Sequence, residues 1–346
     1  MGNVKWITCV AVTACIQTLS VAVLNYAVDP FQHYRKAGIF TPSENQRYEN
    51  PGFAKHYDYD TVIIGSSMTE NFLPSQIDAA LNARSIKLCI SGGSAYEHGL
   101  ILGTAIATGR VDRVLWGMDI QSFQGSVTNV RYGEKLPLYL YDDDPCNDYR
   151  YLLNPDVAKK SCRILVDHFR HGAGNDYDRD RAFYWADSFV FSKESVKRAY
   201  RRPEPRESID PDFTFEKFKS NFDVNVVPHI KRNPGIRFHL FFPPYSILAY
   251  HDWKTCRYFD AAMEFKKYIV NVLDGCPNVA LYDFQADASI THDLDLYKDH
   301  THFSPKISRF IIDSMALGRY RLGKGNVDAR ISTLRSQVES YDMRKM

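Results

Sequence analysis

The sequence predicts an α/β protein with a parallel sheet, preceded by an apolar helix near the N-terminus. Between residues 57 and 322, short apolar runs rich in β-branched residues alternate with longer helical patterns. This alternation is typical of parallel strands joined by helical crossovers. The chain has 346 residues, 45% of them hydrophobic, which suffices for one large core. Residues 6–28 carry no charged side chain.

The apolar run WITCVAVTACIQTLSVAVLNYAV occupies residues 6–28. It is long enough to cross a hydrocarbon core of roughly 30 Å at about 1.5 Å per residue. Polar residues, among them Gln17 and Asn25, dilute its hydropathy. A cleaved signal peptide is the alternative, but the run is long and lacks an obvious A-x-A cleavage site before Tyr26. We therefore expect a membrane anchor over residues 1–28.

Charge and cysteine content give little further information. The formal net charge of +2 provides no broad basic field for nucleic acid. Lys5 precedes the apolar run and Arg35 follows it, so the basic residues leave the orientation of the anchor open. Cys146 and Cys162 either pair or remain free thiols.

The elements before residue 124 follow in a regular order. Residues 29–56 are polar and aperiodic, so we expect an extended arm between anchor and domain. The first strand, Thr61–Ile64, is β-branched throughout, as suits a buried parallel strand. After it we expect, in turn, a helix at 74–82, a strand at 87–90, a helix at 97–108 and a strand at 113–117.

The second half of the chain adds two strands, at 236–242 and 279–284, with a helix at 256–273 between them. The stretch 124–235 is too long for a single crossover. It contains helical patterns at 156–170 and 213–232, and we expect part of it to cap the carboxyl edge of the sheet. A surface helix is expected within 323–346.

Four polar segments follow predicted strands at their carboxyl ends, where open α/β sheets bind ligands. They are GSS at 65–67, SGGS at 91–94, WGMDIQSF at 116–123 and YKDHTHFSP at 297–305. A serine nucleophile needs a base, a group that orients the base, and donors for the oxyanion. Ser67 fits the role of nucleophile, His302 that of base, and Asp299 that of the orienting group. The backbone N–H groups of Ser67 and Gly92 are candidate donors, because glycine allows a close approach of the main chain.

In this order and spacing, IIGSSMTE, CISGGSAYE, WGMDIQSF and DHTHFSP resemble the sequence blocks of the SGNH (GDSL-like) hydrolase superfamily. They are most similar to its membrane-anchored extracytoplasmic branch, which includes the D-alanine-transfer protein of teichoic acids and the alginate O-acetylation proteins. The resemblance covers residues 57–322, apart from most of 124–235. It implies a flavodoxin-like three-layer α/β/α fold, no cofactor, and a triad of Ser67, His302 and Asp299.

The resemblance also suggests the oxyanion donors. The glycine of the second block corresponds to Gly92, with Gly93 one position away. The third block usually carries Asn where this chain has Asp119, and an ionised carboxylate would repel an oxyanion. Either Asp119 is protonated, points away or caps the following loop, or the hole has only backbone donors. Tyr245, in the PPYS segment after the 236–242 strand, is expected in the cleft wall with a contact to the substrate.

Other interpretations of these residues remain. Ser66 and Ser67 are also good helix N-caps. A zinc site is conceivable because imidazole and carboxylate groups ligate zinc, but the spacing matches no helical ligand pattern. That site would use His292, Asp293, Asp299, His300 and His302. We expect no metal, and we expect His300 to be exposed and without a role.

We therefore expect a serine-dependent acyl-ester hydrolase or O-acyltransferase with an acyl-Ser67 intermediate. The resemblance implies a cell-envelope or exported polysaccharide as substrate and a catalytic domain on the periplasmic side of a bacterial cytoplasmic membrane. It also implies a membrane acyltransferase or a polysaccharide assembly machine as partner. The alternatives are a catalytically silent glycan-binding protein and an assembly subunit, both supported mainly by the departure at Asp119.

Overall fold

The computed structural model describes residues 2–42, 45–131, 136–172, 174 and 177–343. The chain divides into two compact units. The small unit comprises Met1–Tyr57 and Leu136–Asp178, and the large unit comprises Asp58–Lys135 and Arg179–Met346.

The large unit is built on a parallel sheet with the strand order β2-β1-β3-β4-β5. The strands are β1 (Thr61–Ile64), β2 (Ser85–Lys87), β3 (Arg113–Gly117), β4 (Arg237–Phe242) and β5 (Val279–Asp283). This is one of the two common orders of doubly wound sheets, in which the order reverses between β1 and β3. The predicted α/β class with a parallel sheet is confirmed.

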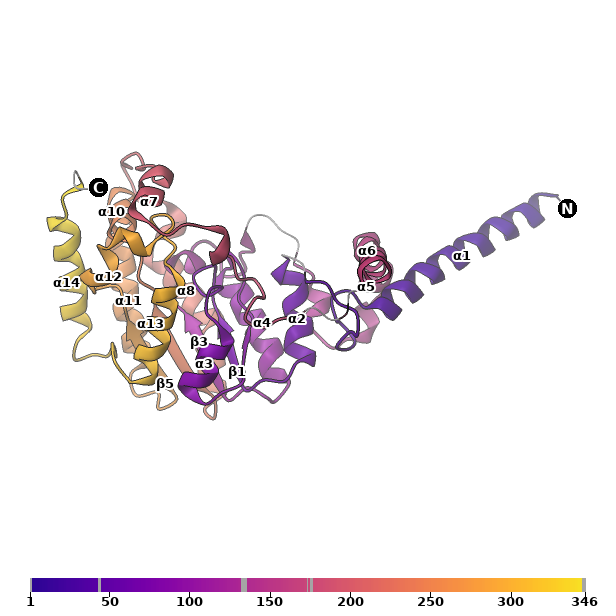
Figure 1. The fold of residues 1–346 in the computed structure, drawn as a ribbon, viewed down its shortest axis with the longest axis horizontal. Coiled ribbons are helices and arrows are strands. Elements are labelled where there is room, and N and C mark those ends of the chain that lie inside the picture. The colour runs from indigo at the N-terminus through magenta and orange to yellow at the C-terminus, as the bar shows by residue number, and fades with distance from the viewer. Residues whose placement is uncertain (1, 43–44, 132–135, 173, 175–176, 344–346) are drawn as a thin grey trace. The chain divides into compact units, whose positions relative to one another are not determined.

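The helices of the large unit are α3 (Pro74–Leu81), α4 (Ala95–Ala107), α7 (Lys193–Ala199), α8 (Phe215–Asn225), α9 (Val227–Arg232), α10 (Ile247–Thr255), α11 (Phe259–Leu273), α12 (Ala288–Thr291), α13 (Pro305–Ala316) and α14 (Val327–Ser340). The chain runs from β1 through α3 to β2, and then back past β1 through α4 to β3. Right-handed crossovers in these opposite directions place α3 and α4 on opposite faces of the sheet. Accordingly α3 contacts α13, whereas α4 contacts α8, which in turn contacts α11 (Figure 1).

Several element boundaries differ from the expectation. The ladder beside β1 continues past the end of β2, since the Leu88 N–H donates to the Ile63 carbonyl and the Ile90 N–H donates to the Gly65 carbonyl, each at 2.9 Å. The helix expected at 213–232 is two helices, α8 and α9. Pro228, which cannot donate a backbone hydrogen bond, lies in the first turn of α9.

The small unit contains α1 (Gly2–Val28), α2 (Gln46–His56), α5 (Tyr149–Leu152) and α6 (Pro155–His171). Its core cluster includes Phe31, Tyr139, Leu140, Tyr151 and Val157. Residues 4–28 of α1 are long and apolar enough to cross a membrane, by length and composition. Short 3-10 helices complete the two units: η1 (Ile120–Phe123), η3 (Leu138–Leu140), η4 (Pro145–Asn147), η5 (Ala186–Ser188), η6 (Pro211–Phe213) and η7 (Leu294–Leu296).

Residues 29–56 differ from the extended arm that we expected, because they contain α2 and contribute to the core of the small unit. The polar side chains of Glu49 and Asn50 are buried. Glu49 is paired there, with Lys160 Nζ 2.7 Å from its Oε1. The polar pattern hid the helix because these side chains face protein rather than water.

The long insertion, part of which we expected to cap the sheet, is divided between the two units. Leu136–Asp178 belongs to the small unit, and only the flanking residues belong to the large unit. Cys146 and Cys162, whose pairing was left open, are both exposed free thiols. The tail helix expected after residue 323 is α14, which turns Leu334 and Val338 into the large unit.

Candidate active site

The turn after β1 exposes Ser67 selectively. Gly65 has a φ of +150°, and a Cβ there would lie 2.7 Å from Thr69 Cγ2, so the position requires glycine. The Thr69 hydroxyl donates to the Ser66 carbonyl at 2.8 Å and closes the turn. Ser66 and Met68 are buried, whereas Ser67 between them is only partly buried. The turn therefore presents the Ser67 hydroxyl at the carboxyl end of the strand.

Ser67, His302 and Asp299 form a continuous hydrogen-bonded line. Ser67 Oγ lies 2.9 Å from His302 Nε2. His302 Nδ1 lies 2.9 Å from Asp299 Oδ2 and 3.1 Å from Oδ1. The carboxylate can only accept from Nδ1–H, which leaves Nε2 free to accept a proton from the serine.

The loop of residues 297–305 holds Asp299 as a carboxylate. Burial alone would raise the pKa of Asp299. The hydrogen bond and charge of His302, with the N–H groups of His302 and Thr301, outweigh burial and bring this pKa well below its usual range. Both N–H groups donate to Oδ1 at 2.8 Å. An ionised Asp299 can orient His302 and stabilise the imidazolium that forms on proton transfer.

Two backbone N–H groups near the Ser67 hydroxyl are available as donors. The hydrogen bond from the Ile90 N–H to the Gly65 carbonyl brings the turn that contains Gly92 next to the turn that contains Ser67. Gly93 is not free, because its N–H donates to the Ile90 carbonyl at 2.8 Å. Among the described residues, the N–H groups of Ser67 and Gly92 have no hydrogen-bond partner. Of the two glycines considered from the sequence, Gly92 is thus the available donor.

Asp119 is buried and fully engaged inside the protein. Its Oδ2 accepts from the Ser66 hydroxyl at 2.6 Å, and its Oδ1 accepts from the Gln121 N–H at 3.0 Å, which caps η1. The Tyr245 hydroxyl also donates to Oδ1. The carboxylate therefore caps a loop, and the Ser66 hydroxyl is occupied by Asp119.

Tyr245 does not line the cleft as we expected. Its side chain is 1% exposed and packs against Trp253, with ring centroids 5.0 Å apart. Burial and the neighbouring Asp119 carboxylate raise the pKa of Tyr245 well above its ordinary value. Helix α10, which the sequence did not reveal, follows Tyr245 and contributes Trp253 to its packing, so the side chain is buried where we expected a substrate contact.

The histidines and carboxylates considered for zinc do not assemble. His300 Nε2 lies 3.7 Å from Asp252 Oδ2, and its ring packs edge-on against Tyr200. Asp299 and His302 are bound to each other. Within the described part of the chain, no group of three or more His, Cys, Asp or Glu side chains could hold a metal ion.

Trp185 and Phe189 form an aromatic wall beside His302 that the sequence did not predict. The Trp185 ring meets the His302 ring edge to face, with centroids 5.5 Å apart. Lys298 Nζ lies 4.1 Å from the Trp185 ring centroid and 3.8 Å from that of Phe189. Phe189 and Val190 are 48% and 70% exposed. The aromatic cluster WADSFVF at 185–191 was the available signal, and nothing in the sequence placed it near residue 302.

Hydrogen bonds attach this aromatic segment to the loops that carry Ser67 and His302. Asn71 Oδ1 accepts from the N–H groups of Trp185 and Ala186 at 3.2 and 3.1 Å. The Ser192 N–H donates to the Tyr297 carbonyl at 3.1 Å. The part of the insertion that belongs to the large unit thus forms one side of the site.

Comparison with known proteins gives no family: no protein-family model matches the chain, and no curated protein is significantly similar to it. The class of the site therefore depends on its geometry. A hydroxyl, a base, an orienting carboxylate and backbone donors are the set that acyl transfer requires.

Proposed function

We propose that this protein is a serine-dependent acyl-ester enzyme that works through an acyl-Ser67 intermediate. The observation that carries the proposal is the hydrogen-bonded line from Ser67 through His302 to Asp299. Ser67 and His302 are 235 positions apart in the sequence, so no local structure accounts for their contact.

In the first half of the reaction, Ser67 Oγ attacks the ester carbonyl carbon and its proton passes to His302 Nε2. The N–H groups of Ser67 and Gly92 stabilise the tetrahedral oxyanion. Collapse breaks the bond to the alcohol oxygen, which takes the proton from His302 and leaves. Asp299 remains ionised and stabilises the imidazolium.

In the second half, an acceptor hydroxyl attacks the acyl-Ser67 carbonyl while His302 removes its proton. Water gives a carboxylic acid and a second alcohol gives a new ester, and both routes restore Ser67. We propose an acylated glycan as the substrate. Trp185 and Phe189 support this choice, because sites for small organic groups combine aromatic surfaces with a few polar groups.

We also propose that the large unit has the SGNH hydrolase fold. The four resembling blocks all lie at carboxyl ends: after β1, beside β1 after β2, after β3, and in the loop that follows β5. The apolar helix α1 supports a membrane-anchored enzyme with its large unit on the periplasmic side. A membrane acyltransferase or polysaccharide assembly machine would supply or use the acyl group. These last assignments rest on the resemblance to the extracytoplasmic branch.

Labelling with a fluorophosphonate probe tests the proposal, because the probe reacts covalently only with an activated serine. The intact protein should be labelled at Ser67, as read by peptide mass spectrometry. Ser67→Ala and His302→Ala should abolish labelling, whereas the matched neighbour His300→Ala should retain it. Labelling at another serine would refute Ser67 as nucleophile.

One observation favours a second function. Asp119 stands where the resembling family usually has an Asn donor, so the oxyanion hole has only backbone donors. A catalytically silent protein that binds a glycan or serves as an assembly subunit would fit this departure. Absence of labelling in a protein with a normal thermal transition would favour that function over catalysis.

A further inference from the structure

Helix α6 carries two apolar faces, and only one of them is covered. Val157, Ser161 and Ile164 are buried in the small unit. A second set of apolar residues follows the spacing i, i+3, i+4, i+7, which places them on one other face. We call this set the outer stripe: Cys162, Leu165, Val166 and Phe169. Phe169 is 81% exposed and Val166 is 43% exposed.

Basic side chains border the outer stripe. At about 100° per residue, Lys159, Arg163 and Arg170 lie together along one edge of it. Two acidic side chains lie close by: Lys159 Nζ is 3.0 Å from Asp156, and Arg163 Nε is 4.0 Å from Asp167. The two cations are exposed and Asp167 is half-buried. Pairs this close to water stabilise little, so the cations remain available to another anion.

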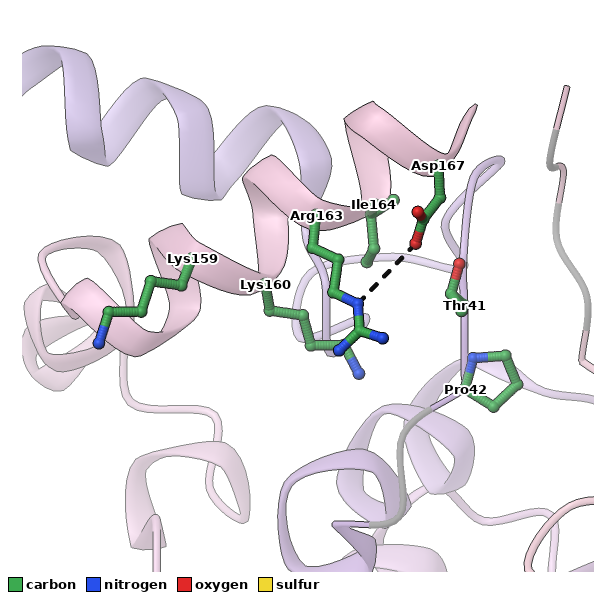
Figure 2. A pocket seen from close by; sticks show the side chains of 7 residues that line it. All are labelled: Thr41, Pro42, Lys159, Lys160, Arg163, Ile164 and Asp167. Atoms are coloured by element: carbon green, nitrogen blue, oxygen red, sulfur yellow. Dashed lines mark ion pairs between the residues drawn. The ribbon is translucent and has the colours of Figure 1, made fainter. Parts of the chain in front are cut away.

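A cavity of about 610 Å³ lies along the other side of this basic edge. It is lined by Thr41, Pro42, Lys159, Lys160, Arg163, Ile164 and Asp167 (Figure 2). Figure 2 shows Lys160 and Arg163 directed toward Pro42, with Lys159 pointing away from them. Lys160 is already paired with Glu49. The open positions for an anion are therefore on the edge of α6 rather than deep in the cavity.

Helix α1 marks the level of a membrane surface. A rise of about 1.5 Å per residue places Trp6 and Tyr26 about 30 Å apart, the thickness of a hydrocarbon core. Both side chains are exposed, at 69% and 52%, as in the aromatic belts of membrane helices. The Arg35 guanidinium lies 4.8 Å from the Tyr26 ring centroid and donates to the Ala27 carbonyl at 3.0 Å. Tyr26 and Arg35 thus correspond to the headgroup region.

Helix α6 is held at that level. Asn25 is fully buried; its Nδ2 donates to the Leu152 carbonyl at 2.9 Å, and its Oδ1 accepts from the Ser161 hydroxyl at 3.0 Å. In Figure 1, α6 is seen end-on while α1 is seen from the side, so the two axes cross. A helix that crosses a membrane span at the headgroup level runs along the membrane surface.

We propose that α6 is an interfacial helix that binds anionic lipid in the membrane spanned by α1. The outer stripe enters the boundary of the acyl chains, and Lys159, Arg163 and Arg170 contact headgroup phosphates with their long side chains. For this contact the Arg163 side chain turns from the cavity and leaves Asp167. The lipid bilayer is the occupant because α6 packs against the membrane-side end of α1, exposes an apolar stripe there, and borders this stripe with cations that complement anionic headgroups. This inference depends on α1 as a membrane span and is independent of the enzymatic proposal.

A nitroxide scan of α6 tests the inference. The full chain, with its native cysteines replaced, carries one spin label at a time from position 159 to 170. It is reconstituted in vesicles of phosphatidylcholine, alone or mixed equally with phosphatidylglycerol. Collision with oxygen should peak at 162, 165, 166 and 169, where collision with a water-soluble nickel chelate should be lowest. A control label at Leu317, which is 65% exposed on the large unit, should be readily accessible to the nickel chelate.

Two outcomes would overturn the inference. If both reagents reach the outer stripe equally well, the stripe lies in water. If neither reagent reaches it, another protein or a second copy covers it.

The role of charge has its own test. Phosphatidylglycerol should move the stripe labels deeper, and the triple change Lys159→Gln, Arg163→Gln and Arg170→Gln should remove this shift. The matched triple change of Lys306, Arg309 and Arg319, which are exposed basic residues of the large unit, should leave the shift intact. Equal depth in both lipid mixtures would refute the headgroup contacts. Fluorophosphonate labelling of the same samples separates this result from the enzymatic proposal.

Discussion

Ser66 and Ser67 are adjacent hydroxyls with different surroundings. The Ser66 hydroxyl donates to the buried Asp119, and the Ser67 hydroxyl faces His302. From the sequence, both were candidate helix caps, and Ser67 was also the candidate nucleophile. Burial separates them, because the turn at Gly65 directs the Ser66 side chain into the core and the Ser67 side chain toward His302.

Gly65→Ala should impair the site without touching the triad directly. A Cβ at this φ of +150° would lie 2.7 Å from Thr69 Cγ2, so the turn must shift. Backbone strain of this kind costs on the order of 1–3 kcal/mol. We expect a lower thermal transition temperature and at least a tenfold slower reaction with the fluorophosphonate. A thermal unfolding curve and a time course of labelling measure the two. Unchanged values for both would show that the turn can adapt.

Asp119→Asn should destabilise the protein without accelerating it. The carboxylate accepts from Ser66, Gln121 and Tyr245, and an amide nitrogen in place of one oxygen cannot accept from a donor. Leaving a buried donor unsatisfied costs about 1–3 kcal/mol. Denaturant unfolding should show this loss, while the hydrolysis of a small acetate ester should not rise. A faster rate would mean that the side chain does reach the oxyanion.

At the level of elements, local patterns predicted the sheet far better than the insertion. Thr61–Ile64 and Arg113–Gly117 were predicted with the bounds that the structure has, because buried parallel strands give short, distinct apolar runs. Helix α2 was missed because its polar side chains face protein. The segment 185–191 was missed as part of the site because its partners, Asn71 and Tyr297, are remote in sequence.

One buried ion pair connects α11 to the end of β5. Lys266 Nζ lies 3.0 Å from Asp283 Oδ1, and the two side chains are 1% and 0% exposed. Burial lowers the pKa of Lys266 from its ordinary value, against the raising effect of the Asp283 carboxylate. The Gln285 N–H also donates to Asp283 Oδ1 at 3.0 Å.

Lys266→Met should destabilise the protein by about 3–5 kcal/mol, because it leaves an uncompensated charge in the core. Urea unfolding at neutral pH measures the change. The double change Lys266→Met with Asp283→Leu removes both charges and should recover part of the loss. If the double variant is no more stable than Lys266→Met, the loss of stability comes from altered packing rather than from the unpaired charge.

At the level of the whole molecule, half-buried histidines should make the fold sensitive to acid. Burial, followed by the charges of Arg113, Arg237 and Arg321, lowers the pKa of His239 to about 4. Burial also lowers the pKa of His229 and of His292. An unfolded chain binds protons at these sites from about pH 6.5 downward, whereas the folded chain does not, so stability falls with falling pH.

The contribution of His239 should be fully present above about pH 6.5 and lost as the pH falls toward about 4, by at most about 3 kcal/mol. His239→Phe should therefore flatten part of the decline in unfolding free energy over this range. Urea titrations at several pH values measure the slope. An unaltered slope would show that His239 is already protonated in the folded protein.

The sequence by itself determined the α/β class, five strand positions near their observed places, and the apolar helix at residues 6–28. These features depend on periodicity and on runs of apolar residues, which are local properties of the chain. It also named the residues of the Ser67, His302 and Asp299 line, because polar segments that follow parallel strands gather at one sheet edge.

Only the tertiary structure decided how the remaining polar groups are used. Asp119 caps a loop and accepts a hydrogen bond from the buried Tyr245. The N–H of Gly93 donates within a turn, and the Trp185 ring packs against His302. In the same way, residues 29–56 contain α2 and form one compact unit with Leu136–Asp178 of the insertion. Hydrogen-bond partners and burial are set by contacts between distant segments, and a linear pattern carries no record of which segments meet.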